Sequence, residues 1–505
     1  MASSLAKVDP SWAWEPAPRE RWNLKWAAHL YRRAAFGTPP ASSSSGTSGW
    51  ELLKQATGRG RDAAVDGLLS GADGRRKFDT LMDEIGTRLS ATATELEKMQ
   101  GWWLYRMLYT PHPLLERCTF LWHNHFATSA AKVRDLKMMF VQNQTLRDHA
   151  LGDFRPMLLA MGRDPAMLVW LDSDSNIKGK PNENYAREVM ELFSLGEGNY
   201  SEKDIQEAAR AFTGRSTRDG KFHSSAQLHD GGQKTVLGQT GNWNGDDVVR
   251  ILLEQKAAAR FLVRKLFREF INDTQTPPDR LLDPLAAEFR KSDYDVSACL
   301  RTLLRSNIFY SEHSYRRRVK SPVEYTIGLL RTFDARVSLE HLATSLVGLG
   351  QSLFAPPNVK GWDGGRSWLN SATLLARHNL AWRLVGGQDS RFRGVDPAAI
   401  TRKNAGKDPA GQVDFLLKLL LQGDIDRRAR DKLVTAAKKL KPENISGRPD
   451  IEDRGGSGKS RVKELGEDFE PATEDVADEN GADDSGSRER ILAHTIILMP
   501  EYQLA

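Results

Sequence analysis

The chain is poor in cysteine and has no long apolar run. Its 505 residues include two cysteines, Cys118 and Cys299, both in apolar helical patterns. A disulfide scaffold and a cysteine-based zinc site are therefore excluded, and we expect two buried free thiols. No stretch approaches the roughly 20 apolar residues of a membrane-spanning helix, and residues 1–19 lack the apolar core of a signal peptide. We expect no membrane span and, as the chain is given, a cytoplasmic protein.

Several common catalytic motifs are also absent. The sequence has no G-x-S-x-G elbow, no H-E-x-x-H pair and no G-x-G-x-x-G that opens a helix after a strand. This argues against common serine hydrolases, zincins and dinucleotide-binding folds. Residues 455–460 superficially resemble a phosphate-binding loop, but Asp453 stands where that pattern needs a glycine. We reject that assignment.

The charged residues nearly balance. There are 72 Lys and Arg residues against 66 Asp and Glu residues, which gives a formal net charge of +6. No run of basic residues is suited to following a phosphate backbone, so we expect no nucleic-acid partner.

Helical periodicity dominates the rest of the sequence. It predicts a mainly α fold, a large multi-helix globular body with a small irregular or β-hairpin region near 215–245. We expect residues 1–441 to form one helical domain, with a split into two lobes near 215–245 as an option. Residues 442–489 form an acidic insert rich in Gly and Ser, with almost no aromatics, and are expected to be disordered. A C-terminal helix at 490–505 should dock back on the body.

The most informative predicted helix covers residues 183–195. On a helical wheel of about 100° per residue, Glu188 falls inside the apolar arc formed by Tyr185, Val189, Leu192 and Leu195. A carboxylate against the core needs a partner, because burying it alone costs several kcal/mol. That partner is an arginine, a set of backbone N–H groups or a metal ion.

Two further segments supply metal-ligand types. His123 and His125 end an apolar helix, and their H-x-H spacing lets them share an ion only if the helix ends there. A hydrogen-bonded core position is the alternative for His125. His229 and Asp230 precede two glycines in a polar loop, where a surface turn is the alternative. Together with the helix at 183–195, these two segments supply the ligands that we expect for one divalent metal ion. The candidate ligands are His123, His125, Glu188, His229 and Asp230.

A third segment is suited to holding a substrate. Residues 356–368 form a rigid loop whose Trp362 and Trp368 can stack on a sugar ring or act as a wedge between helices. We assign catalytic roles to Glu188, Glu191 and Arg187. The expected substrate-binding residues are Asn184, Lys234, Lys360, Trp362 and Arg366.

The order of several blocks resembles the DUF1800 family, a bacterial domain of unknown function. The matching blocks, which span nearly the whole chain, are residues 29–37, 122–126, 181–198, 209–214, 229–231, 320–324, 356–365 and 500–503. The family's members often look exported and often occur beside a family that resembles sulfatases and alkaline phosphatases. The resemblance therefore implies an envelope or periplasmic location and a partner of that kind. This chain departs from it in lacking a recognisable leader and in carrying the acidic insert.

Two functional hypotheses follow. In the first, the chain is an enzyme in which a divalent metal activates water or polarises an ester or glycosidic oxygen, or in which Glu188 is a general base if burial raises its proton affinity. In the second, it is a non-catalytic scaffold or binding partner of an envelope enzyme. Glu188 would then pair with an arginine such as Arg32, Arg33 or Arg210, and His125 would donate to a backbone carbonyl.

Overall fold

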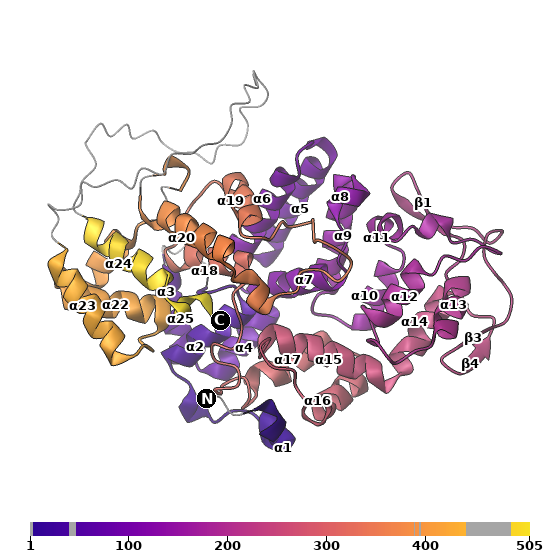
Figure 1. Cartoon of the computed structure of the whole chain (residues 1–505), viewed down its shortest axis with the longest axis horizontal. Helices are drawn as coiled ribbons and strands as arrows, with labels where there is room; N and C mark the ends of the chain where they lie inside the picture. Colours follow the sequence, from indigo (N-terminus) through magenta and orange to yellow (C-terminus); the bar gives the residue numbers. More distant parts are fainter. Residues whose placement is uncertain (1–3, 40–46, 388, 393–394, 441–485) are drawn as a thin grey trace.

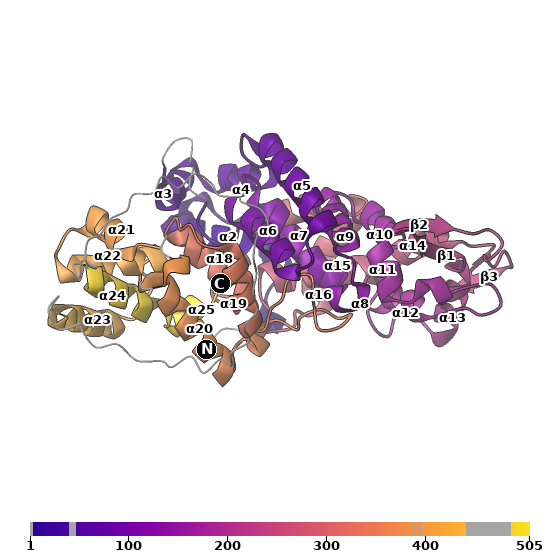
Figure 2. The ribbon, with the colours of Figure 1, turned by 90° about the horizontal axis from the view of Figure 1, so that it is seen from above.

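The computed structural model describes residues 4–39, 47–387, 389–392, 395–440 and 486–505. It is mainly helical, with two small two-stranded antiparallel sheets, and the predicted fold class is confirmed. The molecule is elongated (Figure 1). Helices of the C-terminal part lie at one end and the two sheets lie at the other, with the N-terminal helices between them (Figure 2).

The N-terminal helices form the middle of the molecule. They are η1 (Leu5–Lys7), α1 (Pro10–Trp14), η2 (Arg19–Arg21), α2 (Leu24–Ala34), α3 (Gly49–Arg59), α4 (Arg61–Ser70), α5 (Arg75–Thr92), α6 (Leu96–Tyr109) and α7 (Pro113–His125). Helices α5 and α6 are separate because Ala93, which follows α5, adopts an extended conformation.

The next part carries short helices and both sheets. The helices are α8 (Ala130–Val133), α9 (Leu136–His149), α10 (Phe154–Met161), α11 (Pro165–Trp170), η3 (Ser173–Ser175), α12 (Asn184–Glu191), α13 (Glu202–Ala211) and α14 (Gly245–Glu254). Strands β1 (Arg215–Arg218) and β2 (Lys221–Ser224) form one hairpin, and β3 (Lys234–Val236) and β4 (Gln239–Gly241) form the other. Both hairpins fall in the region predicted at 215–245.

The remaining helices complete the body. They are α15 (Lys256–Phe270), α16 (Asp279–Lys291), α17 (Val296–Arg305), α18 (Pro322–Thr332), α19 (Leu339–Gly348), η4 (Gly365–Trp368), α20 (Ser371–Val385), η5 (Ser390–Phe392), α21 (Pro397–Ala405), α22 (Pro409–Leu421), α23 (Arg427–Lys439), α24 (Ser487–Ile497) and α25 (Pro500–Gln503). Helix α24 contacts α20, α21, α22 and α23, so the C-terminal segment does pack on the body. Residues 442–485 of the predicted acidic insert, the rejected loop at 455–460 included, lie outside the described residues.

Capping boxes are present at the start of two helices. The Ser201 and Asp204 side chains close the start of α13, and the Ser321 and Glu324 side chains close the start of α18. Each box satisfies backbone N–H groups that have no partner inside the helix. These local signals fix where α13 and α18 begin.

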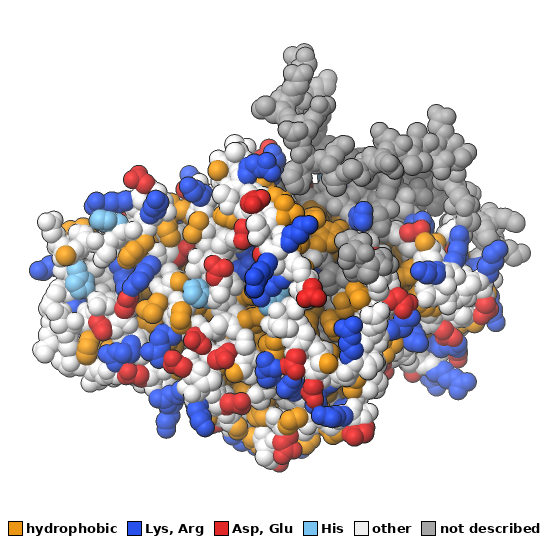
Figure 3. Space-filling model, turned by 180° about the vertical axis from the view of Figure 1, so that it is seen from behind, with side chains coloured by type: hydrophobic (Ala, Val, Ile, Leu, Met, Phe, Trp, Pro, Cys, Tyr) orange, Lys and Arg blue, Asp and Glu red, His pale blue; other side chains and the backbone are white. Residues whose placement is uncertain are grey.

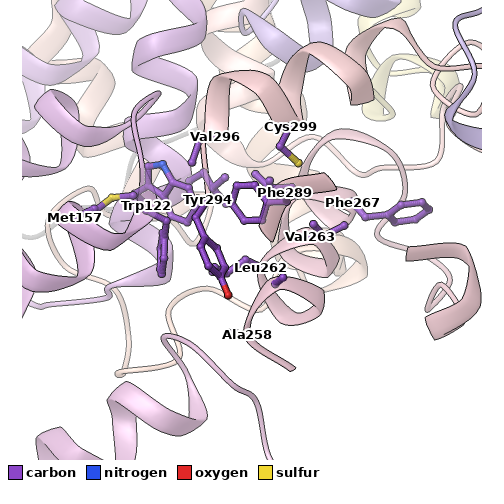
Figure 4. Close-up of a cluster of buried hydrophobic side chains, with 14 of the residues drawn as sticks. Trp122, Met157, Ala258, Leu262, Val263, Phe267, Phe289, Tyr294, Val296 and Cys299 are labelled. Carbon is purple, nitrogen blue, oxygen red and sulfur yellow. The ribbon is translucent and has the colours of Figure 1, made fainter. Parts of the chain in front are cut away.

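Two buried apolar clusters form the core. One joins α1, α7, α10 and α12–α17, and the other joins α3, α5, α6, α18–α20, α22 and α24. Figure 4 shows part of the first cluster, where Trp122 and Met157 lie beside Phe289, Tyr294 and Val296. Cys118 and Cys299 are both buried free thiols in this cluster, as predicted.

Buried ion pairs tie the helices together. The Glu116 carboxylate is fully buried and accepts hydrogen bonds from Arg106 Nε at 2.9 Å, Arg147 Nε at 2.6 Å and Trp103 Nε1 at 3.0 Å. Although burial acts in the opposite direction, these guanidinium groups lower the pKa of Glu116 to about 2. The carboxylate is therefore a fixed charge at the junction of α6, α7 and α9.

On the face of the molecule in Figure 3, basic and acidic side chains are interspersed. Among the described residues, none of the helices combines the length and the apolar character needed to cross a bilayer.

Candidate functional site

The predicted site residues fall in three separate places. Glu188 and Lys360 lie together beside α7, His229 and Asp230 lie at the hairpins, and His123 and His125 point into the core on different sides of α7. In the described part of the chain, no group of three or more His, Cys, Asp and Glu side chains is arranged to hold a metal ion. The structure thus does not bring the five expected ligands to one point.

The loop between α19 and α20 runs across the molecule to the end of α7 (Figure 1). Asn124 holds it there, since its Oδ1 accepts a hydrogen bond from the Trp362 N–H at 2.7 Å and its Nδ2 donates to the Trp362 carbonyl at 3.3 Å. Gly361 has φ +80°, and a Cβ at this position would lie 2.2 Å from Asn124 Oδ1. Only glycine therefore fits this close approach.

This clamp positions Lys360 near Glu188. Lys360 is exposed, and its charge acts on the Glu188 carboxylate. Three of the segments that resemble the family (122–126, 181–198 and 356–365) therefore meet here. We call Glu188, Glu191 and Lys360 the carboxylate site.

Glu188 itself is half-buried, not fully buried as the helical wheel predicted. Helix α12 ends at Glu191, so Leu192 and Leu195 do not continue its apolar stripe, and the buried face consists of Tyr185, Ala186, Val189 and Met190. Glu188 lies at the edge of this face.

No described residue forms a hydrogen bond or an ion pair with the Glu188 carboxylate. Burial and the neighbouring Glu191 raise its pKa above the usual 4.5, whereas Lys360 and Arg187 act in the opposite direction. Of the arginines considered as partners, Arg33 donates to the carbonyls of Ile271 and Ser314, and Arg210 pairs with Glu207 and Asp230. Arg32 donates to Gln422. None of the three arginines considered in the second hypothesis pairs with Glu188.

The neighbours of Glu188 on α12 do have partners. Glu191 accepts a hydrogen bond from the Tyr200 hydroxyl at 2.9 Å. Arg187 pairs with Glu183 and Glu202, at 3.1 and 2.8 Å. Asn184 is exposed at the start of the helix. Glu188 is thus the acidic side chain of α12 that remains available to a substrate.

The two histidines of α7 are buried and neutral. His123 Nε2 accepts a hydrogen bond from the Phe354 N–H at 3.3 Å, and burial lowers its pKa to about 3. His125 Nε2 donates to the Phe193 carbonyl at 3.1 Å, and its Nδ1 is buried without a partner. Burial, followed by the charge of Lys265, holds the pKa of His125 well below its usual value. Helix α7 does end at His125, yet the two rings contact different elements.

The polar segment at the hairpins is held by its own hydrogen bonds. The Asp230 carboxylate accepts from Arg210 Nε at 2.8 Å, which lowers its pKa to about 2. His229 Nδ1 lies 3.1 Å from the Thr213 carbonyl. Lys234 is buried, and its Nζ donates to the carbonyls of Asp230 and Gly232. These side chains hold the turn that leads into β3.

The two tryptophans of the loop are buried rather than presented at the surface. Trp362 packs on Phe120 and His123, with ring centroids 6.4 and 5.9 Å away, and it shares a small apolar cluster with Trp368 and Val319. This is the arrangement of a wedge between helices. Arg366 is exposed in η4.

Sequence reasoning missed Lys265 on α15. Burial and then Arg268 lower its pKa to about 7, and its Nζ lies 5.1 Å from the centre of the Phe261 ring. One signal was present in the sequence. Arg260, Arg264 and Arg268 recur every four residues along one face of α15, and Lys265 falls outside that stripe.

Comparison with models of known protein families supports the resemblance that the ordered sequence blocks indicated. The model of a family described as a protein of unknown function, DUF1800, matches residues 29–504. No curated protein and no solved structure matches the chain. Because the family model covers nearly the whole sequence, this chain belongs to the DUF1800 family.

Proposed function

We propose that this chain is a hydrolase-like enzyme that acts on a polar or anionic substrate, a glycan or an ester, with Glu188 as its general base. The observation that carries this proposal is the state of the Glu188 carboxylate, which is half-buried, has no partner among the described residues and has a raised pKa. Groups with perturbed pKa values and no structural partner are enriched at active sites.

In this proposal, Glu188 transfers a proton from water to the leaving group. The carboxylate takes a proton from a water molecule as the water oxygen attacks the acyl or anomeric carbon, the bond to the leaving oxygen breaks, and the proton passes to the leaving group. A general base works best when its pKa lies near the working pH, and desolvation beside Glu191 moves Glu188 in that direction. No step requires a metal ion.

Lys360 and Glu191 have supporting roles. Lys360 carries an exposed positive charge beside the base, so it attracts an anionic group of the substrate. Glu191, one helical turn from Glu188, provides a second carboxylate, and the Tyr200 hydroxyl bound to it fixes its position. Most glycoside hydrolases use two carboxyl groups that lie in different environments.

A second proposal is a non-catalytic scaffold that binds a partner protein, such as one resembling sulfatases or phosphatases. It is supported by the exposed apolar side chains of Val347, Leu374 and Leu375, which are 52%, 46% and 61% exposed. They lie on α19 and α20, two helices in contact with each other. Exposed apolar patches can mark interaction surfaces.

The experiment is a screen of chromogenic esters and glycosides with the wild type, Glu188→Gln and Glu197→Gln. Glu197 is an exposed carboxylate of the same segment, so its variant controls for the change in charge. We expect Glu188→Gln to lose about 10²- to 10⁴-fold in kcat/KM and Glu197→Gln to retain activity. Full activity in Glu188→Gln would refute the proposal. The scaffold would be favoured by two results together. The wild type would turn over none of the substrates, and a partner protein would co-purify tightly with the wild type but not with a variant in which Leu374 and Leu375 are replaced by Ser.

A further inference from the structure

A small hollow lies where three other family-like segments meet. It is lined by Arg32, Thr38, Lys320, Glu324, Gln422 and Tyr502, together with apolar side chains that include Phe36, Leu53 and Leu420. Arg32, Lys320 and Tyr502 belong to the segments 29–37, 320–324 and 500–503. Helices α2, α18 and α25 lie close together in both views (Figures 1 and 2). None of these residues belongs to the carboxylate site.

The hollow is small. Its cavity volume is about 30 Å³. This is room for a few heavy atoms but not for a sugar or a nucleotide.

Lys320 is an unusual lining residue. The residue is 6% exposed, and its Nζ, which is not completely buried, has no acceptor among the described residues. The ammonium lies 3.6 Å from the centre of the Tyr502 ring, a cation–π contact. Burying an ammonium group without a counter-ion is costly, and burial, followed by the charge of Arg32, holds the pKa of Lys320 well below its usual value. A bound anion would stabilise the charged form of this side chain.

Two further lining atoms also lack a partner. The hydroxyl oxygen of Thr38 and the Nε of Arg32 are both buried without a hydrogen bond. The opposite end of the Arg32 guanidinium donates to Gln422, so its orientation is fixed. A hydroxyl, a guanidinium N–H and an ammonium group therefore line one hollow, and each of them can donate to an anion.

The acid in the lining cannot serve as the missing partner. Glu324 Oε1 accepts from Arg117 at 2.6 Å and from Arg318 at 2.9 Å, and its Oε2 accepts from the Ser321 N–H at 2.9 Å. The other charged groups that act on Lys320 are all arginines: Arg32, Arg377 and Arg316. The surroundings of the hollow thus carry an excess of positive charge.

We propose that this hollow is a binding site for a small carboxylate with a short apolar tail, in which Lys320, Arg32 and Thr38 hold the carboxylate group. The apolar walls formed by Phe36, Leu53 and Leu420 favour a carboxylate over inorganic phosphate, since phosphate would leave its oxygens facing these side chains without donors. Planar carboxylates also match the donor geometry of a guanidinium group.

Thermal unfolding of the whole chain tests this site. The melting temperature is measured in increasing acetate, propionate, phosphate and chloride at constant ionic strength, because a ligand that binds the native state raises it. We expect propionate and acetate to stabilise the wild type beyond chloride and phosphate, with saturation. Lys320→Met should weaken propionate binding by about tenfold or more, the size of one lost charge-assisted hydrogen bond.

Two more variants keep the test decisive. Thr38→Val, which conserves shape, should weaken propionate binding several-fold, and it decides the test if Lys320→Met does not fold. Lys432→Met removes an exposed lysine of α23 and should bind propionate as the wild type does. Stabilisation by phosphate alone, an equal response to all anions, or unchanged propionate binding in both Lys320→Met and Thr38→Val would overturn the proposal.

Discussion

The Asn124 side chain binds the Trp362 backbone at both its N–H and its carbonyl, at 2.7 and 3.3 Å. This pair fixes the loop between α19 and α20 to the end of α7, although 238 residues separate the two positions. Lys360, two residues before Trp362, depends on this contact for its place beside Glu188. The carboxylate site is therefore built by long-range packing, with a base on one segment and a cation on another.

Replacing Asn124 by Ala should loosen the loop. The change removes two hydrogen bonds and leaves the Trp362 N–H without a protein acceptor, so we expect a loss of about 1–3 kcal/mol in the free energy of unfolding. Hydrogen exchange should increase at residues 356–365, as measured by mass spectrometry. Asn404→Ala, at an exposed position of α21, is the control and should change stability by less than about 0.5 kcal/mol. Unchanged exchange in the loop would contradict the role given to Asn124.

Replacing Glu116 by Gln should be much more damaging. The variant leaves Arg147 without its buried counter-ion, whereas Arg106 keeps Asp79 and Asp83. Breaking a buried ion pair costs about 3–5 kcal/mol. Chemical denaturation at pH 7 measures this, with the exposed Glu84→Gln as the control in neighbouring α5. A loss of less than about 1 kcal/mol would show that the network is not structural.

The same carboxylate should make the protein sensitive to acid. The folded-state pKa of Glu116 is about 2, below the usual 4.5, so its stabilising contribution is present above about pH 4.5 and is lost as the pH falls towards 2. The wild type should lose stability over this window more steeply than Glu116→Gln. Parallel pH–stability curves for the two proteins would contradict this assignment.

Local sequence patterns predicted the helices better than they predicted the site. The capping boxes at Ser201 and Ser321 are local signals of this kind, because each depends on residues three positions apart. The wheel placed Glu188 too deep because it assumed that α12 continues to Leu195, whereas this helix ends at Glu191.

Contacts between residues far apart in the chain could not be predicted from the sequence. Nothing in the spacing of His123 and His125 shows that one ring meets the backbone of Phe354 and the other that of Phe193. In the same way, the position of Lys360 beside Glu188 follows from the Asn124 clamp and has no local signal.

Metal content tests whether any divalent ion belongs to this chain. The five expected ligands lie apart, and Asp230 is already paired with Arg210, so we expect elemental analysis of chelator-dialysed protein to find far less than one metal ion per chain. Glu188→Gln and His125→Ala should leave that content unchanged. Near-stoichiometric metal that falls in both variants would place these residues in one metal site and contradict the present account.

The measurement that tests the account most directly is the titration of the Glu188 carboxyl by ¹³C NMR, with the resonance assigned by its loss in Glu188→Gln. We predict a pKa above the usual 4.5 in the wild type, because burial and Glu191 disfavour the ionised form. Lys360→Ala should raise this pKa further, since it removes a favourable positive charge, and Glu191→Gln should lower it, since it removes a repulsive negative charge. A wild-type pKa at or below 4.5, or one that neither variant shifts, would contradict the claim that these three residues form a tuned acid–base site.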